Sequence, residues 1–208
     1  SRGEVVTVAV FVLYGDTMTA DATMMVETCK WHGYEVIQLA DDVAPRIAGV
    51  DHLFRAPIDM KKQELWRYER LQEVTPPFVS LDTDLLVVKD ISDGFDPDYD
   101  AVLTERPASG TPFNSGVFFV HSPKFIPECV RRIKEMRPGD QNWGGGQSAM
   151  RDIRHDGQMK IKSLPCSEWN DSKHVKVGTY SGARVLHFKG GRKPHMRSMY
   201  EERKRERK

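Results

Sequence analysis

The chain has 208 residues, of which 39% are hydrophobic, and a formal net charge of +1. This hydrophobic content supports a full core, and no linker, internal repeat or low-complexity tract divides the chain, so we expect one α/β domain rather than a repeat or multidomain protein. The apolar run from Val5 to Tyr14 is too short to span a membrane.

The charge is unevenly distributed. Residues 189–208 contain nine Lys/Arg and three Glu, a local charge of +6, so the rest of the chain carries −5. We therefore expect a globular domain over 1–196 and a basic C-terminal tail over 197–208. The simplest interpretation of the tail is a solvated helix. A second functional hypothesis is an anion-binding protein whose tail holds nucleic acid or lipid electrostatically, although scarce aromatic residues argue against stacking on bases.

The cysteines indicate the compartment. Cys29, Cys129 and Cys166 are odd in number, far apart and form no CxxC pair, so we expect free thiols and neither a zinc site nor a disulfide framework. Free thiols fit a reducing, cytoplasmic location. The basic tail adds the hypothesis of a peripheral contact with a membrane.

The first elements predict the opening of a nucleotide-binding sheet. A β-branched strand at 5–12, a helix at 19–32 and a strand at 35–39 form a βαβ unit, whose ligand would bind at the strand tips. The GxGxxG of dinucleotide-binding proteins is missing. Tyr14 and Asp16 follow the first strand, where they could stack on and hydrogen-bond to a base. For Asp16 an ordinary turn is the simpler interpretation.

An amphipathic helix is expected at 60–73. Its apolar side includes Leu65 and Leu71. Lys62 and Arg67 lie on the polar side, where a surface charge is the simplest interpretation of any helical Lys or Arg.

Two acids interrupt the apolar run at 78–88. Unpaired carboxylates are too costly to desolvate within a buried strand, so the strand should end near Leu81 and leave Asp82 and Asp84 in a crevice at its carboxyl end. Residues two apart on an extended segment point the same way, so both carboxylates can reach one divalent cation. The alternative is a solvated acidic turn.

The second half of the chain predicts further strands and helices. Asn114 stands at the polar entrance of a strand at 113–120, where it could bond to a polyol, and Gly116 permits a close backbone approach. The segment 139–147, which contains three consecutive glycines, is expected to be a mobile polar loop near the ligand. The remaining expected elements are strands at 100–104, 160–164 and 185–188 and helices at 123–136 and 148–154.

The segment His187–Pro194 satisfies the pattern HxxGxxKP. An imidazole that follows an apolar strand can meet a metal, Gly190 lets the backbone close over a phosphate, and Lys193 can neutralise phosphate charge. Taken alone, His187 could equally be a core histidine at a strand end, and Lys193 a surface charge.

Together with the upstream acids, these features resemble the GT-A glycosyltransferases, most closely the retaining family 8 that includes glycogenin and the lipopolysaccharide galactosyltransferases. The features are the DxD at 82–84, the small-residue strand entrance at 113–117, a Gln-containing Gly-rich loop that leads into a helix, and the HxxGxxKP motif. The resemblance runs from about Lys62 to Pro194. It implies a GT-A (Rossmann-like) fold with a mostly parallel central sheet flanked by helices.

The resemblance also implies the metal and diphosphate contacts. Asp82, Asp84 and His187 would hold Mn²⁺ or Mg²⁺, with Asp82 also near the ribose. Two carboxylates and an imidazole suit Mn²⁺. Lys193 and the backbone at Gly190 would hold the diphosphate.

Further contacts to the donor follow from the same resemblance. Tyr14 and Asp16 would meet the uracil, and Lys62 would bind the donor, although the stretch from the following Trp to the DxD is longer here than in glycogenin-like enzymes. Asn114 would face the sugars. The family usually carries Asp-Gln at the donor-sugar loop. Here Gly146 precedes Gln147, and the pair Asp140-Gln141 lies six residues earlier, so either Asp140 or Gln147 could contact the sugar.

The implied activity is the transfer of a hexose from a nucleotide diphosphate sugar, with UDP-glucose and UDP-galactose the leading candidates, to a sugar, polyol or glycolipid hydroxyl with retention of configuration. No carboxylate nucleophile is evident in the sequence, so same-face attack is favoured. A nucleotidyltransferase or a sugar-nucleotide hydrolase would share the sheet and the metal site.

Overall fold

The structure is a computed structural model that describes residues 6–106, 110–172 and 182–207. Most strands form one sheet with the order β3-β2-β1-β4-β7-β6-β8, and β5 pairs with β9 in a second, smaller sheet. The strands are β1 (Val8–Leu13), β2 (Glu35–Ala40), β3 (His52–Arg55), β4 (Phe78–Leu81), β5 (Leu85–Val87), β6 (Ala101–Glu105), β7 (Phe113–Val120), β8 (Ile161–Pro165) and β9 (Val185–His187). The helices are α1 (Thr19–Lys30), α2 (Gln63–Leu71), α3 (Phe125–Glu135), α4 (Pro138–Asn142), α5 (Gly145–Asp156), α6 (Cys166–Trp169) and α7 (Pro194–Glu206), with 3-10 turns η1 (Met60–Lys62), η2 (Ser92–Gly94) and η3 (Gly190–Arg192).

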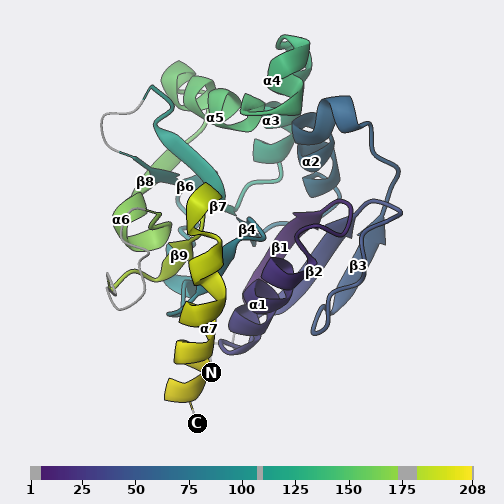
Figure 1. Cartoon of the computed structure of the whole chain (residues 1–208). Coiled ribbons are helices and arrows are strands. Elements are labelled where there is room, and N and C mark those ends of the chain that lie inside the picture. The colour runs from purple at the N-terminus through teal and green to yellow at the C-terminus, as the bar shows by residue number, and fades with distance from the viewer. Residues whose placement is uncertain (1–5, 107–109, 173–181, 208) are drawn as a thin grey trace.

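Helices cover both faces of the sheet (Figure 1). Side chains alternate along each strand, so in β1 Phe11 packs toward α1, whereas Val10 packs toward α2, α3 and α5. Strand β7 is antiparallel to its neighbours β4 and β6, and the other neighbouring pairs of the sheet are parallel. The predicted α/β fold with a mostly parallel central sheet is therefore confirmed.

The chain reverses its direction of travel across the sheet between β1 and β4. Strands β1, β2 and β3 run outward in sequence order, and the chain then returns to place β4 on the other side of β1. Ligands of open α/β sheets bind at such a switch point, beyond the carboxyl ends of the strands. Tyr14 directly follows β1 and Asp82 directly follows β4, so both residues stand at this edge. Strand β4 ends at Leu81, as predicted.

The last helix packs against the second sheet. Met196, Met199 and Tyr200 of α7 are buried in a cluster that also contains residues of β5 and β9. Helix α7 thus runs without a break across residue 196, and the described part of the basic tail rests on the body of the protein. The tail is helical, in agreement with the simplest interpretation of its sequence.

Basic groups of α7 and of the residue that follows it are engaged within the protein. Lys204 Nζ lies 2.9 Å from Glu27 Oε1, and the Arg207 guanidinium lies 5.2 Å from the centroid of the Trp31 ring. These contacts compete with any anion that binds the tail. The anion-binding hypothesis therefore stays a prediction.

The structure corrects three sequence expectations. The segment 139–147 is not a loop but contains α4 and the first turn of α5. Its glycines allow close packing, because a Cβ at Gly146 would lie 2.3 Å from the Tyr68 hydroxyl. The expected core strand at 160–164 is β8, a half-exposed edge strand. Strand β3 was not expected.

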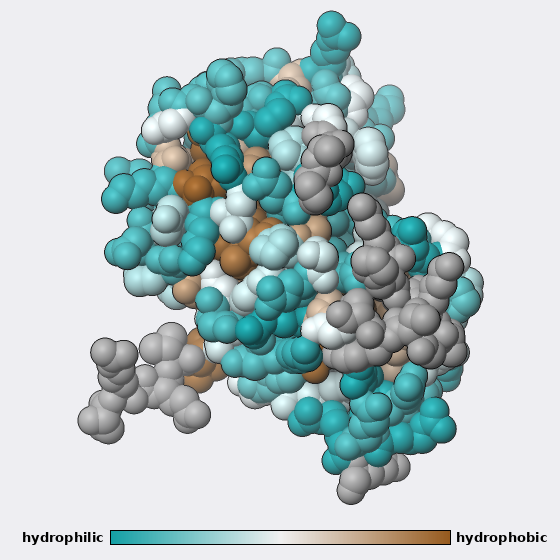
Figure 2. Space-filling model, turned by 90° about the vertical axis from the view of Figure 1, so that its left-hand side faces the viewer, coloured by the Kyte–Doolittle hydropathy of each residue, from teal (hydrophilic) through white to brown (hydrophobic). Residues whose placement is uncertain are grey.

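The cysteines are buried, and one face of the protein is mostly polar (Figure 2). All three cysteines are free and buried, as expected. None of the helices in the described ranges is long and apolar enough to cross a bilayer. The face on the side of α6 and β8 is mostly hydrophilic, with only small hydrophobic areas (Figure 2).

Candidate functional site

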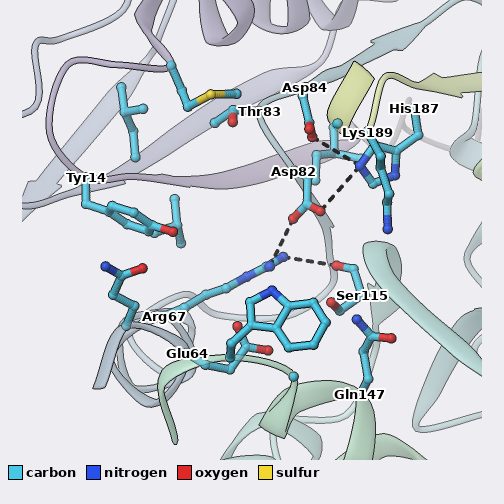
Figure 3. Close-up of a pocket in the computed structure, with 18 of the residues that line it drawn as sticks. Tyr14, Glu64, Arg67, Asp82, Thr83, Asp84, Ser115, Gln147, His187 and Lys189 are labelled. Carbon is cyan, nitrogen blue, oxygen red and sulfur yellow. Dashed lines mark hydrogen bonds and ion pairs between the residues drawn. The ribbon is translucent and has the colours of Figure 1, made fainter. Parts of the chain in front are cut away.

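A cavity of about 600 Å³ opens at the switch point. The ends of β1 and β4, one side of α2, the junction of α4 and α5, and the segment after β9 all contribute to its lining. Figure 3 shows Tyr14 and Gln147 on opposite sides of this cavity, with Arg67 between them and Asp82 and Asp84 above Arg67. The lining is rich in polar and charged side chains, which suits a charged, hydrophilic ligand.

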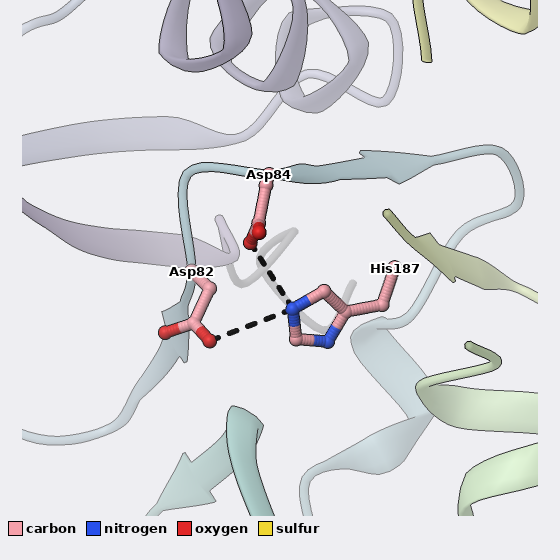
Figure 4. Close-up of side chains that lie close together, drawn as sticks. All are labelled: Asp82, Asp84 and His187. Atoms are coloured by element: carbon pink, nitrogen blue, oxygen red, sulfur yellow. Dashed lines mark hydrogen bonds and ion pairs between the residues drawn. The ribbon is translucent and has the colours of Figure 1, made fainter. Parts of the chain in front are cut away.

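Pairing between β5 and β9 brings the two acids and the histidine together. Leu85 lies opposite His187 in this antiparallel pair, and the backbone N–H of Phe188 donates to the carbonyl of Asp84 at 2.8 Å. The imidazole Nε2 of His187 then lies 3.1 Å from Asp84 Oδ1 and 3.6 Å from Asp82 Oδ2 (Figure 4). Residues more than 100 positions apart in sequence thus form one cluster, which we call the triad.

Each carboxylate of the triad divides its two oxygens between the imidazole and a cation. Asp82 Oδ1 lies 2.9 Å from Arg67 Nη1, and Asp84 Oδ2 lies 3.6 Å from Lys193 Nζ. The oxygens that remain face Nε2 of His187. Burial raises the pKa of Asp84, but the hydrogen bond and charge of His187 and the charge of Lys193 outweigh it, so the pKa lies below its ordinary value.

The triad fits a divalent cation. Ligand atoms that sit about 2.1 Å from an ion at right angles are separated by about 3.0 Å, close to the 3.1 Å between Nε2 of His187 and Asp84 Oδ1. The other ring nitrogen, Nδ1, lies 2.7 Å from Oδ1 of the buried Asn170. The Asn170 amide donates to Thr104 Oγ1 at 3.0 Å, so its oxygen accepts from Nδ1–H. A metal ion between Nε2 and the carboxylates would therefore meet the Nε2 lone pair, as in metal-binding histidines with an outer hydrogen-bond partner.

Gly116 makes room for the triad. A Cβ at this position would lie 2.4 Å from Cε1 of His187 and 3.0 Å from Asp82 Oδ2. The backbone of β7 is held there because the N–H of Asp82 donates to the Gly116 carbonyl at 2.9 Å. The close approach expected at this glycine is therefore to the histidine ring.

Arg67 is a site residue that the sequence did not reveal. It was interpreted as a surface charge, but its side chain is only 13% exposed and also donates to the Ser115 carbonyl at 3.0 Å. Burial alone would lower the pKa of Arg67, but the charges of Asp82 and Glu64 hold it above its ordinary value. The sequence signal that could have identified Arg67 is its pairing with Glu64, which lies three residues earlier on the same side of an amphipathic helix.

Glu64 and Lys189 were also missed. Burial raises the pKa of Glu64, against the lowering effect of Arg67, and one carboxylate oxygen accepts from the N–H of Gly146 at 3.1 Å. Glu64 is thus a cavity carboxylate outside the triad, which the sequence did not show. Burial lowers the pKa of Lys189, two residues after His187.

Four of the predicted residues line the cavity in addition to the triad: Tyr14, Gln147, Gly190 and Lys193. Burial raises the pKa of Tyr14, so its phenol stays protonated near neutral pH. The amide oxygen of Gln147 accepts from Arg106 at 2.9 Å. Gly190 has a positive φ of 54° in the turn before α7, a backbone shape that favours glycine.

Four other predicted residues do not line the cavity. Asp16 and Lys62 are exposed, and the carbonyl of Asp16 accepts from the N–H of Thr19 at the start of α1. Asp140 is exposed on α4. Asn114 is buried, and its Oδ1 accepts from Lys189 Nζ at 2.9 Å. Asn114 therefore holds a lysine of the lining rather than facing the cavity.

Solved glycosyltransferases share this fold. A glycosyltransferase involved in the glycosylation of the major capsid of PBCV-1 aligns with a TM-score of 0.66 and 17% identity, over 92% of this chain and 99% of that chain. The bifunctional glycosyltransferase WbbM aligns with a TM-score of 0.58 and 9% identity, over 91% and 47% of the two chains.

A pyrophosphorylase shares the fold as well. The nucleoside-diphosphate-sugar pyrophosphorylase of Vibrio cholerae RC9 aligns with a TM-score of 0.52 and 8% identity, over 93% and 99% of the two chains. No protein-family model and no curated protein sequence matches the chain. At these identities the likenesses show the fold, and the assignment to family 8 stays a prediction.

Proposed function

We propose that this protein is a metal-dependent glycosyltransferase that transfers a hexose from a UDP-sugar, either UDP-glucose or UDP-galactose, to a hydroxyl of an acceptor. The observation that carries the proposal is the triad of Asp82, Asp84 and His187 in a cavity at the switch point. The likeness of the fold to solved glycosyltransferases supports the same reaction class.

The charge of the cavity supports a metal-bound diphosphate. Besides His187, its ionisable lining consists of three carboxylates and three cations: Glu64, Asp82, Asp84, Arg67, Lys189 and Lys193. These charges cancel, so a diphosphate alone would leave the cavity negative, whereas a diphosphate with a divalent cation would not. Mn²⁺ or Mg²⁺ held by the triad would offset charge on the leaving diphosphate.

The remaining lining supports a proposed position for each end of the donor. Tyr14 lies beside the carboxyl end of β1, where it would stack on the uracil, and Lys193 and the backbone of Gly190 would hold the diphosphate. Gln147 lies on the opposite side of the cavity (Figure 3), where it would contact the hexose. Lys193 acts as a fixed cation that stabilises charge as it builds on the leaving oxygen.

The proposed stereochemical course is retention by same-face attack. The acceptor oxygen bonds to the anomeric carbon as the bond from that carbon to the phosphate oxygen breaks, and the phosphate oxygen takes the acceptor proton. Glu64 is the only carboxylate of the described cavity lining outside the triad. An inverted anomer, determined by NMR of the product, would refute same-face attack and make Glu64 the first candidate for the base to be tested.

The test is nucleotide release from a panel of sugar nucleotides with Mn²⁺ present. Asp84→Ala should abolish transfer through loss of the metal, and EDTA should do the same to the unaltered protein. Lys193→Ala should weaken UDP binding in calorimetry. Full activity of Asp84→Ala together with indifference to EDTA would overturn the metal assignment, and an unchanged UDP affinity would remove Lys193 from the diphosphate site.

A second candidate is a nucleotidyltransferase, which the likeness to the pyrophosphorylase favours. Such an enzyme would form a sugar nucleotide from a nucleoside triphosphate and a sugar 1-phosphate and release pyrophosphate. Product analysis separates the two candidates, because a transferase releases UDP in proportion to acceptor, a hydrolase releases it without acceptor, and a nucleotidyltransferase releases pyrophosphate.

A further inference from the structure

Trp143 is a large apolar side chain that the fold leaves in solvent at the cavity. Its side chain is 80% exposed, more than any other large hydrophobic side chain in the described ranges, and it lines the cavity. Tryptophan is ordinarily well buried. An indole left open at a polar cavity therefore offers an apolar face to a ligand.

The backbone holds Trp143 in place. It stands between α4 and α5, where its N–H donates to the carbonyl of Gly139 at 3.0 Å. The next residue, Gly144, has a φ of 81° that favours glycine. A hydrogen bond from the Gly146 N–H to Glu64 Oε1, at 3.1 Å, ties the start of α5 to α2. The exposure of the indole thus follows from a packed junction.

The position of Trp143 in the chain places it at the sugar end of the cavity. It lies two residues before α5 and four before Gln147 of that helix, and Gln147 lies across the cavity from Tyr14, on the far side of Arg67 (Figure 3). A nucleotide with its base at Tyr14 and its diphosphate at the triad directs its hexose toward this end. The high exposure of Trp143 suits the outer position, where a second substrate enters from solvent.

We propose that Trp143 stacks on a sugar ring of the acceptor, so that the acceptor is a carbohydrate. This inference rests on the proposed transferase function. A pyranose has a face of C–H groups that buries apolar area on an aromatic ring, and its hydroxyls need donors and acceptors around the edge. The amides of Asn142, Gln147 and Gln63 line the same cavity. An indole in a cavity that also holds amides matches a sugar ring better than it matches a wholly apolar lipid chain.

The first test is the protection of Trp143 from acrylamide quenching of tryptophan fluorescence, with Mn²⁺ and UDP present. Trp66 and Trp169 are buried and Trp31 is stacked on Tyr200, so the readily quenched emission comes from Trp143. The probes are methyl α- and β-glucosides, galactosides and mannosides, lactose and maltose, with glycerol and a threonine peptide as non-sugar probes. At least one saccharide should protect the signal, and Trp143→Ala should lack it. Protection by no saccharide, or by the non-sugar probes alone, would overturn the proposal.

The second test is transfer to the protecting saccharide. Trp143→Ala should raise the acceptor KM about tenfold or more, and Trp143→Phe should have a KM between those of Trp143→Ala and the unaltered protein. The UDP affinity of both variants should stay within about twofold of the unaltered protein. The matched control is Phe54→Ala, an exposed aromatic residue on β3 outside the cavity, which should change neither quantity. An unchanged acceptor KM, or a parallel loss of UDP affinity that assigns the indole to the uracil, would refute the proposal. If a saccharide protects Trp143 but the protein binds no UDP, the proposed transferase function is refuted and the saccharide contact of Trp143 is not.

Discussion

Gly116 is the position where one added methyl group should abolish metal binding. In Gly116→Ala the new Cβ would lie 2.4 Å from Cε1 and 2.7 Å from Nδ1 of His187. Carbon atoms in contact need about 3.5 Å, so the ring and the methyl group must separate by roughly 1 Å. The ring is 1% exposed and its Nδ1 is held by Asn170, so a ring that moves away from the methyl group loses that hydrogen bond.

The expected magnitude follows from these distances. Metal–ligand distances in a working site hold within about 0.2 Å, so a displacement of roughly 1 Å removes His187 from the ligand set. Disturbing a mere outer-shell partner costs roughly 10–100-fold in metal affinity, so we expect a loss of at least about 100-fold here. Overpacking should cost about 1–3 kcal/mol of stability, which lowers the melting temperature by roughly 2–12 °C and leaves the variant folded.

The assay is Mn²⁺ binding by calorimetry, with circular dichroism in EDTA to confirm the fold. The matched control is Gly110→Ala, where an added Cβ meets no atom within 4 Å and Mn²⁺ affinity should be unchanged. A folded Gly116→Ala that binds Mn²⁺ as tightly as the unaltered protein would refute the reasoning, because a displaced imidazole cannot be a ligand.

Three further predictions concern buried charges and thiols. Arg67→Met removes the guanidinium that pairs with Asp82 and should cost about 3 kcal/mol in EDTA, part of which Mn²⁺ should restore. The control is Arg70→Met, which breaks the partly exposed pair between Arg70 of α2 and Glu73 after the helix and should cost at most about 1 kcal/mol. Equal losses in urea denaturation would contradict this prediction. Burial raises the pKa of Glu64 from 4.5, so the folded chain binds the proton of this carboxyl more tightly than the unfolded chain does. The unaltered protein should therefore lose stability relative to Glu64→Gln as the pH rises above 4.5. Parallel curves of stability against pH for the two proteins would argue against this. Burial raises the pKa of Cys29 to about 12, so iodoacetamide at pH 8 should label it only after unfolding, and rapid labelling of the native protein, detected by mass spectrometry, would disprove the burial.

The elements that local patterns predicted well are those with strong hydrophobic periodicity. Strands β1, β2, β4 and β7 and helices α1 and α3 lie close to their expected positions, since each has a face that must be buried. Strand β3 was missed because its four residues are mostly exposed and show no such face. The glycines at 144–146 were interpreted as flexible because sequence alone cannot show that Tyr68 and the Asp140 backbone occupy the space of a side chain.

Site residues that belong to a short sequence motif were predicted, whereas those that depend on which way a helix face points were missed. The acids after β4 and the HxxGxxKP motif pointed to the residues of the triad. Arg67 and Glu64 were not identified, because a polar helix side can face solvent or a cavity with the same residue pattern. Asn114 accepts a hydrogen bond from Lys189 and does not face the cavity. The alternation of side chains along a strand does not predict how far a side chain lies from the cavity.

By itself the sequence determined that two carboxylates follow a buried strand, since desolvation forces such groups out of an apolar strand, and that an imidazole lies at the end of a second apolar segment. Only the tertiary structure decided that these groups meet. Their meeting depends on the register of β5 against β9, on the placement of β4 beside β1, and on the absence of a side chain at Gly116. Each of these is a contact between segments distant in the chain, which local periodicity does not carry.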